Sequence, residues 1–233
     1  MRERLLVVPR PAVRALTAAI DLVLLTPRDR SLAVLLLRAA DSRARDRWLL
    51  PWDAPRSEED PDQAAVRLAR AVLGTSPAAM EQIGAFGDGR RHPGEAQISV
   101  AFVGLVPHGP ESQSSDNAIW VELGQLPAMA PRQRAMVDAA VEAVRQRIDQ
   151  APLAFRLLPS AFTLSELQGI YELILGRPLH KASFRRALQA AFLVEPTDEW
   201  RSEGRGRPAQ LYRYAPRRRR TGRRGVRFDL IQQ

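Results

Sequence analysis

Residues 162–192 read FTLSELQGIYELILGRPLHKASFRRALQAAF, and this stretch decides the fold of the carboxy-terminal part of the chain. Thr163-Leu-Ser-Glu166 has the form of a capping box, and Phe162 is placed to staple the entry of the helix that follows. Gly176 and Pro178 end that helix. Its apolar face is predicted to consist of Leu167, Tyr171 and Ile174.

A second helix is predicted from about His180 to Phe192. Its buried side chains, at four-residue spacing, are expected to be Phe184, Leu188 and Phe192. The opposite face carries a small residue, two guanidinium groups and an amide, from Ala182, Arg185, Arg186 and Gln189. Such groups meet phosphates and the edges of guanine and adenine in a major groove. The alternative is an exposed pair of arginines that water merely solvates.

Residues 204–214, GRGRPAQLYRY, form a glycine-arginine turn followed by an alternating strand. Helix, turn, basic helix and basic hairpin occur in the order of a winged helix-turn-helix domain, which reads DNA with its second helix. An RNA-associated basic adaptor is a further interpretation. The residues predicted to contact double-stranded DNA are Thr163, Ser165, Lys181, Ser183, Arg185, Arg186, Gln189, Arg205, Arg207 and Tyr212.

The charge of the chain is segregated. Residues 1–150 hold 19 basic and 19 acidic side chains, whereas residues 151–233 hold 16 basic and 7 acidic ones, so the whole net charge of +9 lies in the last third. This asymmetry is typical of a polyanion-binding module appended to a neutral domain. Seven arginines between Arg217 and Arg227 contribute to it, and we expect residues 216–233 to form a flexible basic tail.

The amino-terminal part is predicted to mix strands and helices. Asp21–Leu25 and Leu32–Leu37 are short apolar runs that predict a hairpin, and Gln97–Val106 predicts a further strand. A helix is expected over Asp62–Leu73, closed by Gly74. A later one, from about Arg132 to Ile148, carries a stripe of Val137, Val141, Val144 and Ile148.

These residues resemble the NrtR group of Nudix-related transcriptional regulators. The similarity includes Phe162–Gln168, Phe184-Arg-Arg186, Arg207-Pro-Ala209 with Leu211-Tyr-Arg213, and upstream Phe86-Gly-Asp88 and Ile98–Phe102. It implies an α+β protein: a Nudix-like α/β/α sandwich with a mixed sheet, followed by a winged helix-turn-helix domain. We expect a sensor and dimerisation domain at 1–150, joined near Gln150–Pro152 to a DNA-binding domain at 151–215.

The Nudix signature G-x5-E-x7-R-E-U-x-E-E-x-G-U, with U a bulky apolar residue, aligns with residues 53–75 without a gap. Glu59, Arg67 and Gly74 match it. Asp53 replaces the glycine, and Leu68, Ala71 and Val72 replace the three helix glutamates. In Nudix enzymes these carboxylates hold the magnesium that polarises a diphosphate. We therefore expect no catalytic residue, no metal and no cofactor, but a scaffold that binds a nucleotide without cleaving it.

The resemblance implies ADP-ribose or a related product of NAD metabolism as the effector of a repressor. The candidate ligand-binding residues are Arg38, Trp48, Phe86, Arg90 and Arg91. Trp48 and Phe86 could instead be core residues, and Arg90 or Arg91 could instead be a solvated loop residue. The family continues this loop as Arg-Asp-Pro-Arg, whereas here Arg91-His-Pro-Gly94 lacks the acid and the second arginine.

Other classes of protein fit the sequence less well. The absence of cysteine excludes disulfides and thiolate zinc sites, and the three histidines lack metal-ligand spacing. Arg14 and Asp21 interrupt the apolar stretch at residues 12–25, which argues against a signal peptide. We expect a cytoplasmic homodimer on a palindromic operator. The alternative function is a Nudix-type hydrolase that uses the displaced carboxylates Glu58, Glu59 and Glu95 and carries a basic nucleic-acid-binding extension.

Overall fold

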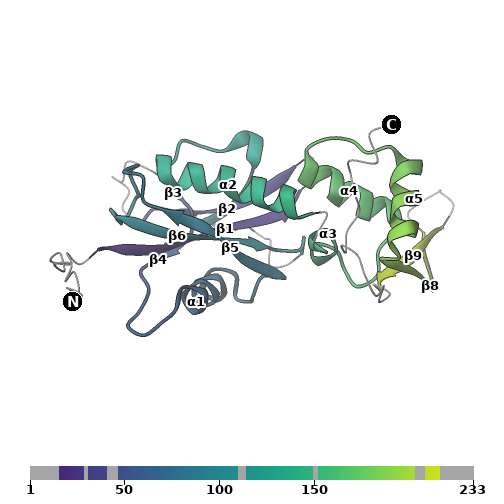
Figure 1. The fold of residues 1–233 in the computed structure, drawn as a ribbon, viewed down its shortest axis with the longest axis horizontal. Helices are drawn as coiled ribbons and strands as arrows, with labels where there is room; N and C mark the ends of the chain where they lie inside the picture. Colours follow the sequence, from purple (N-terminus) through teal and green to yellow (C-terminus); the bar gives the residue numbers. More distant parts are fainter. Residues whose placement is uncertain are drawn as a thin grey trace, which may run out of the picture.

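The computed structural model of the chain describes residues 16–28, 31–40, 47–109, 114–148, 152–202 and 208–215. A sheet with two flanking helices comes first in the chain, and a smaller helical part with a two-stranded sheet follows (Figure 1). The elements in chain order are β1 (Ala18–Pro27), β2 (Leu32–Arg38), β3 (Trp48–Leu49), β4 (Trp52–Asp53), α1 (Pro61–Leu73), β5 (Ala79–Phe86), β6 (Ile98–Leu105), β7 (Ala118–Glu122), η2 (Leu123–Gln125), α2 (Pro131–Arg147), α3 (Leu153–Arg156), α4 (Leu164–Leu175), α5 (Lys181–Ala191), β8 (Val194–Arg201) and β9 (Ala209–Tyr214).

The larger sheet is mixed. Its main order is β3-β2-β1-β6-β5, with β4 paired to β1 and β7 paired to β2. Strands β1 and β6 run parallel, with Asp21 opposite Ala101, and the other pairings are antiparallel. The predicted hairpin of β1 and β2 and the predicted strand β6 are confirmed.

Helices cover both faces of this sheet, which makes an α/β/α sandwich (Figure 1). Along β1, successive side chains point to opposite faces and both sets are buried, as expected of a central strand. Leu22 and Leu24 pack with the buried face of α1, whereas Val23 and Leu25 belong to the cluster that contains α2. The predicted fold class is thus confirmed.

Both sandwich helices have the boundaries that their sequences predict to within a residue or two. Asp60 caps α1 through a capping box with Gln63, and Gly74 ends the helix with φ of 73°. On α2 the predicted stripe of Val137, Val141, Val144 and Ile148 is buried.

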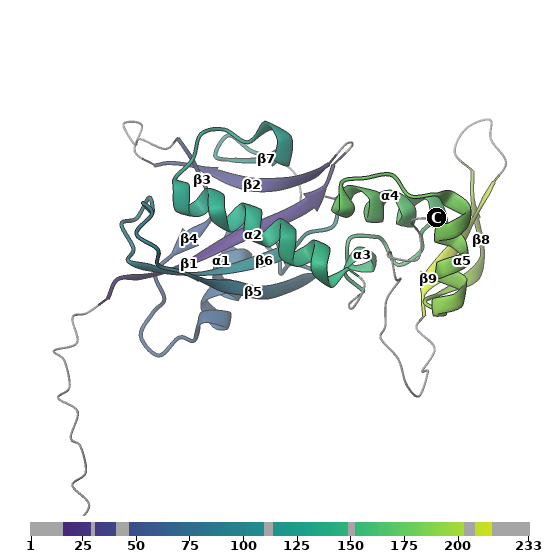
Figure 2. The ribbon, with the colours of Figure 1, turned by 45° about the horizontal axis from the view of Figure 1, so that its top comes forward.

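The carboxy-terminal part, α3 to β9, is a winged helix (Figure 2). The predicted capping box is present at the start of α4, because Thr163 Oγ1 accepts from Glu166 N at 3.1 Å and Glu166 Oε2 accepts from Thr163 N at 2.6 Å. Gly176 ends α4 with φ of 67°. The wing pairs β8 with β9, and a bridge between Phe162 and Tyr212 joins β9 to the segment before α4.

The expected burial of Phe192 is wrong. Its side chain is 45% exposed, because α5 ends at Ala191 and Phe192 is the C-cap, with φ of 53°. The left-handed backbone turns the side chain off the stripe that Phe184 and Leu188 continue to occupy. The sequence predicted a wing hairpin but gave residues only to the strand after its turn, so the first strand, β8, which contains Pro196 and three acidic residues, was not located.

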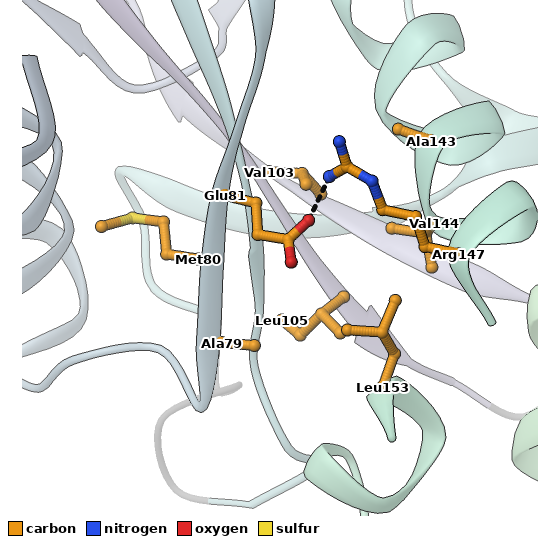
Figure 3. Close-up of a pocket in the computed structure, with 9 residues that line it drawn as sticks. All are labelled: Ala79, Met80, Glu81, Val103, Leu105, Ala143, Val144, Arg147 and Leu153. Carbon is orange, nitrogen blue, oxygen red and sulfur yellow. Dashed lines mark hydrogen bonds and ion pairs between the residues drawn. The ribbon is translucent and has the colours of Figure 1, made fainter. Parts of the chain in front are cut away.

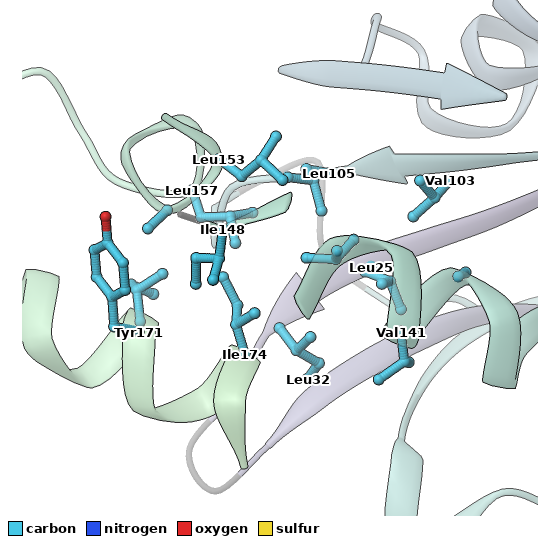
Figure 4. Close-up of a cluster of buried hydrophobic side chains, with 14 of the residues drawn as sticks. Leu25, Leu32, Val103, Leu105, Val141, Ile148, Leu153, Leu157, Tyr171 and Ile174 are labelled. Carbon is cyan, nitrogen blue, oxygen red and sulfur yellow. The ribbon is translucent and has the colours of Figure 1, made fainter. Parts of the chain in front are cut away.

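One hydrophobic core runs through both parts of the chain (Figure 4). Leu25, Leu32 and Val141 of the sandwich belong to the same buried cluster as Tyr171 and Ile174 of the winged helix. Leu153, the first residue of α3, and Leu157, the C-cap of α3, join the two sets. The winged helix is therefore packed directly onto the sandwich.

Candidate DNA-binding helix and ligand pocket

Helix α5 presents an uncovered basic face. Phe184 and Leu188 are buried, whereas the side chains that face outward are exposed, namely Lys181, Ala182, Arg185, Arg186 and Gln189. The helix contains no acidic residue, and within the described ranges neither Arg185 nor Arg186 has an ion-pair partner. Two guanidinium groups are thus free for phosphate oxygens or a guanine edge.

The turn between α4 and α5 is held by side chains of α4. Glu172 Oε1 accepts from Leu179 N at 2.8 Å and from Gln168 Nε2 at 2.9 Å, and the same Gln168 nitrogen donates to Leu179 O at 3.0 Å. The rings of Tyr171 and Phe184 meet edge to face, with centroids 5.3 Å apart. These contacts fix the angle between the two helices and hence the direction in which the α5 face points.

The other predicted DNA contacts lie in different surroundings. Ser165 is exposed on the first turn of α4, and Ser183 is half-buried, with its hydroxyl 3.2 Å from His180 Nδ1. Thr163 is buried and its hydroxyl serves the cap. Tyr212 is half-buried against the core. Arg205 and Arg207, like the tail at 216–233, lie outside the described residues.

Sequence reasoning missed an ion pair that ties the wing to α4. Arg201, the last residue of β8, donates through Nη1 to Glu166 Oε1 at 2.6 Å and through Nη2 to Ala161 O at 3.3 Å. The capping box occupies only one carboxylate oxygen of Glu166, so the other was available for a cation. That spare oxygen was the only sequence signal for the contact.

An open pocket lies beside the carboxyl end of β2 and the last turn of α1. Its volume is about 630 Å³, and its lining consists of Leu37, Arg38, Ala39, Ala40, Ala71, Val72, Asn117 and Ala118. Among the predicted ligand residues only Arg38 contributes to this lining. Ala71 and Val72 stand where the Nudix signature has its glutamate pair, so this wall of the pocket carries no charge.

The remaining predicted ligand residues are not at this pocket. Trp48 is paired with Arg38 in the sheet but packs, like Phe86, against the core cluster that contains α2. Arg90 is exposed and its Nε lies 3.1 Å from Asp88 Oδ2. Arg91 is half-buried, and its carbonyl accepts from Arg132 N.

A second hollow, between β5, α2 and α3, is far smaller (Figure 3). Its volume is about 10 Å³ and its lining is apolar apart from the ion pair of Glu81 and Arg147. That space corresponds to about one water molecule. The hollow beside β2 is therefore the better candidate for a nucleotide.

Glu59 and Arg67, which match the Nudix signature, form a closed ion-pair group at the start of α1 with Asp53, which replaces the signature glycine. Arg67 donates through Nε to Glu59 Oε1 at 2.7 Å and through Nη2 to Glu59 Oε2 at 2.9 Å, and Nη1 reaches Asp53 Oδ2 at 2.6 Å. The hydrogen bond from Arg67, followed by one from Arg56 N, lowers the pKa of Glu59 to about 2. Both oxygens of Glu59 are thus engaged by a cation of the protein itself.

A buried polar network lies below the first turn of α2. Asp21, His92 and Gln133 are at most 2% exposed, and Asp21 Oδ1 receives His92 Nε2 at 3.1 Å and Gln133 Nε2 at 2.8 Å. His92 Nδ1 accepts from Gly94 N at 3.0 Å, which leaves Nε2 as the protonated, donating nitrogen. A carboxylate inside an apolar strand was the sequence signal for such a network.

Comparison with known proteins agrees with this arrangement. A family model described as the NUDIX domain matches residues 15–140, and a second, described as the NrtR DNA-binding winged helix domain, matches residues 154–214. The two models together define a DNA-binding regulator built on a Nudix fold. The chain belongs to the Nudix family, and within it to the NrtR-like transcriptional regulators.

Individual relatives span most of the chain. The ADPR responsive transcriptional repressor NtrR of Acinetobacter baylyi is 29% identical over 84% of this chain and 81% of its own length. NrtR of Shewanella oneidensis, in a crystal structure with a 27mer DNA, is 29% identical with a TM-score of 0.73, covering 85% of this chain and 94% of that one. Its crystal structure without DNA gives a TM-score of 0.74 at 28% identity, over 86% and 94% of the two chains. None of the described helices combines the length and hydrophobicity that a bilayer span requires.

Proposed function

We propose that the chain is a transcriptional repressor that binds operator DNA and leaves it when ADP-ribose or a related nucleotide binds its Nudix-type domain. The observation that carries this proposal is the exposed basic face of α5, whose arginines have no ion-pair partner among the described residues, in a winged helix packed onto a Nudix sandwich. The Acinetobacter relative is named as an ADPR-responsive repressor, and the Shewanella relative as a DNA complex, which supports both halves of the proposal.

The reading of DNA is assigned first to α5. Arg185 and Arg186 are the residues best placed to grip phosphates or a guanine edge, and Gln189 to meet an adenine. Lys181 and Ser183 would add contacts on the first turn of the helix. Ser165 on α4 and the wing residues Arg205 and Arg207 would contact the backbone beside it.

The effector is assigned to the pocket beside β2. Its volume of about 630 Å³ lies within the range of small-molecule sites, and Arg38 supplies a cation for a diphosphate. Trp48, Phe86, Arg90 and Arg91 stay candidates for the same ligand. A nucleotide that reached both the pocket and the loop at 87–97 would extend along the end of the sheet.

We propose further that the domain binds its nucleotide without hydrolysing it. Magnesium requires oxygen ligands, yet α1 carries no carboxylate from Ala64 to its end, and Glu59 is engaged by Arg67. Among the residues that the structure describes, no three histidine, cysteine, aspartate or glutamate side chains gather in a group that could hold a metal. Pure protein is expected to release no product from ADP-ribose with magnesium; activity abolished by Glu59→Gln would support the hydrolase instead.

A homodimer completes the proposal. Two winged helices, one from each protomer, would lie on successive major-groove faces of a palindromic operator, as half-site spacing requires. Within each protomer the Nudix-type domain at 1–150 would sense and dimerise, and residues 151–215 would read DNA. Sedimentation of the protein with and without operator measures this stoichiometry.

The test begins with selection of bound genomic fragments, followed by titration of a labelled fragment. Arg185→Ala with Arg186→Ala is expected to weaken specific binding about 30-fold or more, because a good bidentate base contact contributes about 1–3 kcal/mol. The charge-matched control is Arg70→Ala with Arg134→Ala, two exposed arginines of α1 and α2. Equal affinities of both variants would remove α5 from the interface. Addition of ADP-ribose to the wild type should release the fragment.

A further inference from the structure

Helix α2 is attached at its first turn to the buried network of the sandwich. Gln133 is fully buried, and besides its bond to Asp21 its Oε1 accepts from Leu50 N at 3.0 Å. The neighbouring Arg132 donates through Nη1 to Ala96 O, and its backbone nitrogen donates to Arg91 O at 3.3 Å. The start of α2 is thus bonded to β1 and, through Arg91 and Ala96, to the loop on both sides of His92.

That loop is held against the sheet at the same place. The ring of Trp52 meets His92 edge to face, with centroids 5.0 Å apart. Gly94 lies so close to Trp52 that an added Cβ would clash with its ring, so the loop cannot approach the sheet further. Asp21 Oδ2 has no partner among the described residues, and the orientation of this carboxylate therefore depends on His92 and Gln133 together.

The last turn of α2 is attached to the winged helix. Arg145 Nε donates to Ile174 O at 2.9 Å, and an added Cβ on Gly176 would lie 3.2 Å from Arg145 Nη2. Val144 and Ile148 belong to the shared core, and Figure 4 shows Ile148 beside Leu157 and Ile174. Arg145 therefore bonds a free carbonyl at the end of α4, directly before the turn that leads into α5.

Helix α2 carries both attachments and is uninterrupted over its 17 residues, Pro131–Arg147. At 1.5 Å per residue it spans about 25 Å. A helix held by side-chain bonds at both ends moves as a unit, so a shift of its first turn displaces the carbonyl that Arg145 holds. Both views show α2 running along the sheet toward α4 (Figures 1 and 2).

We propose that α2 is the element that couples the effector site to the DNA-binding helix, with Gln133 and Arg145 as the positioning residues at its two ends. A nucleotide that extends from the pocket beside β2 to the loop at 87–97 and moves this loop changes the hydrogen bonds that His92 and Gln133 share on Asp21. The change passes along α2 to the end of α4 and alters the direction of α5. This inference rests on the proposed function, because it concerns how the effector acts on DNA binding.

The test compares Arg145→Met with Arg134→Met, a matched loss of one arginine from the same helix. Arg134 is exposed, and among the described residues its side chain pairs only with Asp138, at 3.3 Å. For each protein the operator dissociation constant is measured with and without saturating ADP-ribose, and the ratio of the two constants reports coupling whatever the absolute affinity. ADP-ribose binding is measured separately by calorimetry.

We expect the ratio of the wild type and of Arg134→Met to be equal and the ratio of Arg145→Met to fall at least five-fold toward unity, while ADP-ribose affinity changes less than two-fold. Arg145→Lys, which keeps a donor for Ile174 O, should restore part of the ratio and serves if the methionine variant folds poorly. An unchanged ratio in both Arg145 variants, with a responsive wild type, overturns the inference and leaves the proposed function standing. A wild-type ratio of one overturns the proposed function itself.

Discussion

Ile174 lies on α4 in the winged helix, yet its side chain is fully buried in the core shared with the sandwich. Ile174→Ala removes three carbons, which contribute about 2.4 kcal/mol at about 0.8 kcal/mol each. The cavity that remains adds to this loss, so we expect the free energy of unfolding to fall by about 3 kcal/mol. For a chain of this size that corresponds to a drop in Tm of roughly 6–12 °C.

The informative measurement is whether this loss of stability affects the sandwich as well as the winged helix. Three tryptophans lie in the sandwich, and the fourth, Trp200, is 57% exposed on the wing, so a Trp200→Phe background leaves fluorescence that reports the sandwich alone. Because the core is shared, sandwich fluorescence and far-ultraviolet circular dichroism should shift by the same amount in one transition. Leu173→Ala, one residue earlier and half-buried, should shift both less. Sandwich fluorescence that melts at the wild-type midpoint while the helical signal melts earlier would refute a common core.

Three further predictions address local features. Gly176→Ala should destabilise the fold by about 1–2 kcal/mol, because φ there is 67°, whereas Gly169→Ala, inside α4 with open space around it, should stabilise it by about 0.5–1 kcal/mol; urea unfolding measures both. The carboxyl of Glu59 should titrate near pH 2 by NMR, so its ion pair with Arg67 stabilises the fold fully above pH 4.5 and is lost as the pH falls through about 2; Arg67→Met should return the midpoint toward 4.5. Removal of the tail after Ala215 should flatten the salt dependence of DNA affinity and leave sequence preference unchanged in a competition assay.

Local signals in the sequence were sufficient for most helices. The capping box at Thr163 and the glycines at 74 and 176 each act within four residues, so they fix the start of α4 and the ends of α1 and α4 without tertiary information. The same logic failed at Phe192. Its four-residue spacing from Leu188 was correct, but the helix ends one residue earlier, at Ala191. Phe192 itself takes the left-handed conformation, and no glycine in the sequence indicated this helix end.

Strands and sites were harder because their partners lie far along the chain. The β8 strand carries proline and acidic residues and becomes a strand only through its pairing with β9. Asp21 was visible as a charge inside an apolar run, yet its partners are 71 and 112 residues away. Arg38, Ala71 and Val72 line the same pocket. The Nudix signature identified Ala71 and Val72 as altered positions, but it could not show that they form one side of a pocket with Arg38.

The core that Ile174 and Tyr171 share with Leu25 and Val141 also limits how such regulators can exchange parts in evolution or in the laboratory. A recombination point in the connection after α2 would separate leucines and aromatic residues that shield one another from water. Each fragment would then expose an apolar surface prone to aggregation. A new DNA specificity is therefore easier to acquire by changing the exposed residues of α5 in place. A winged helix transferred to another sensor domain would have to include the last turns of α2.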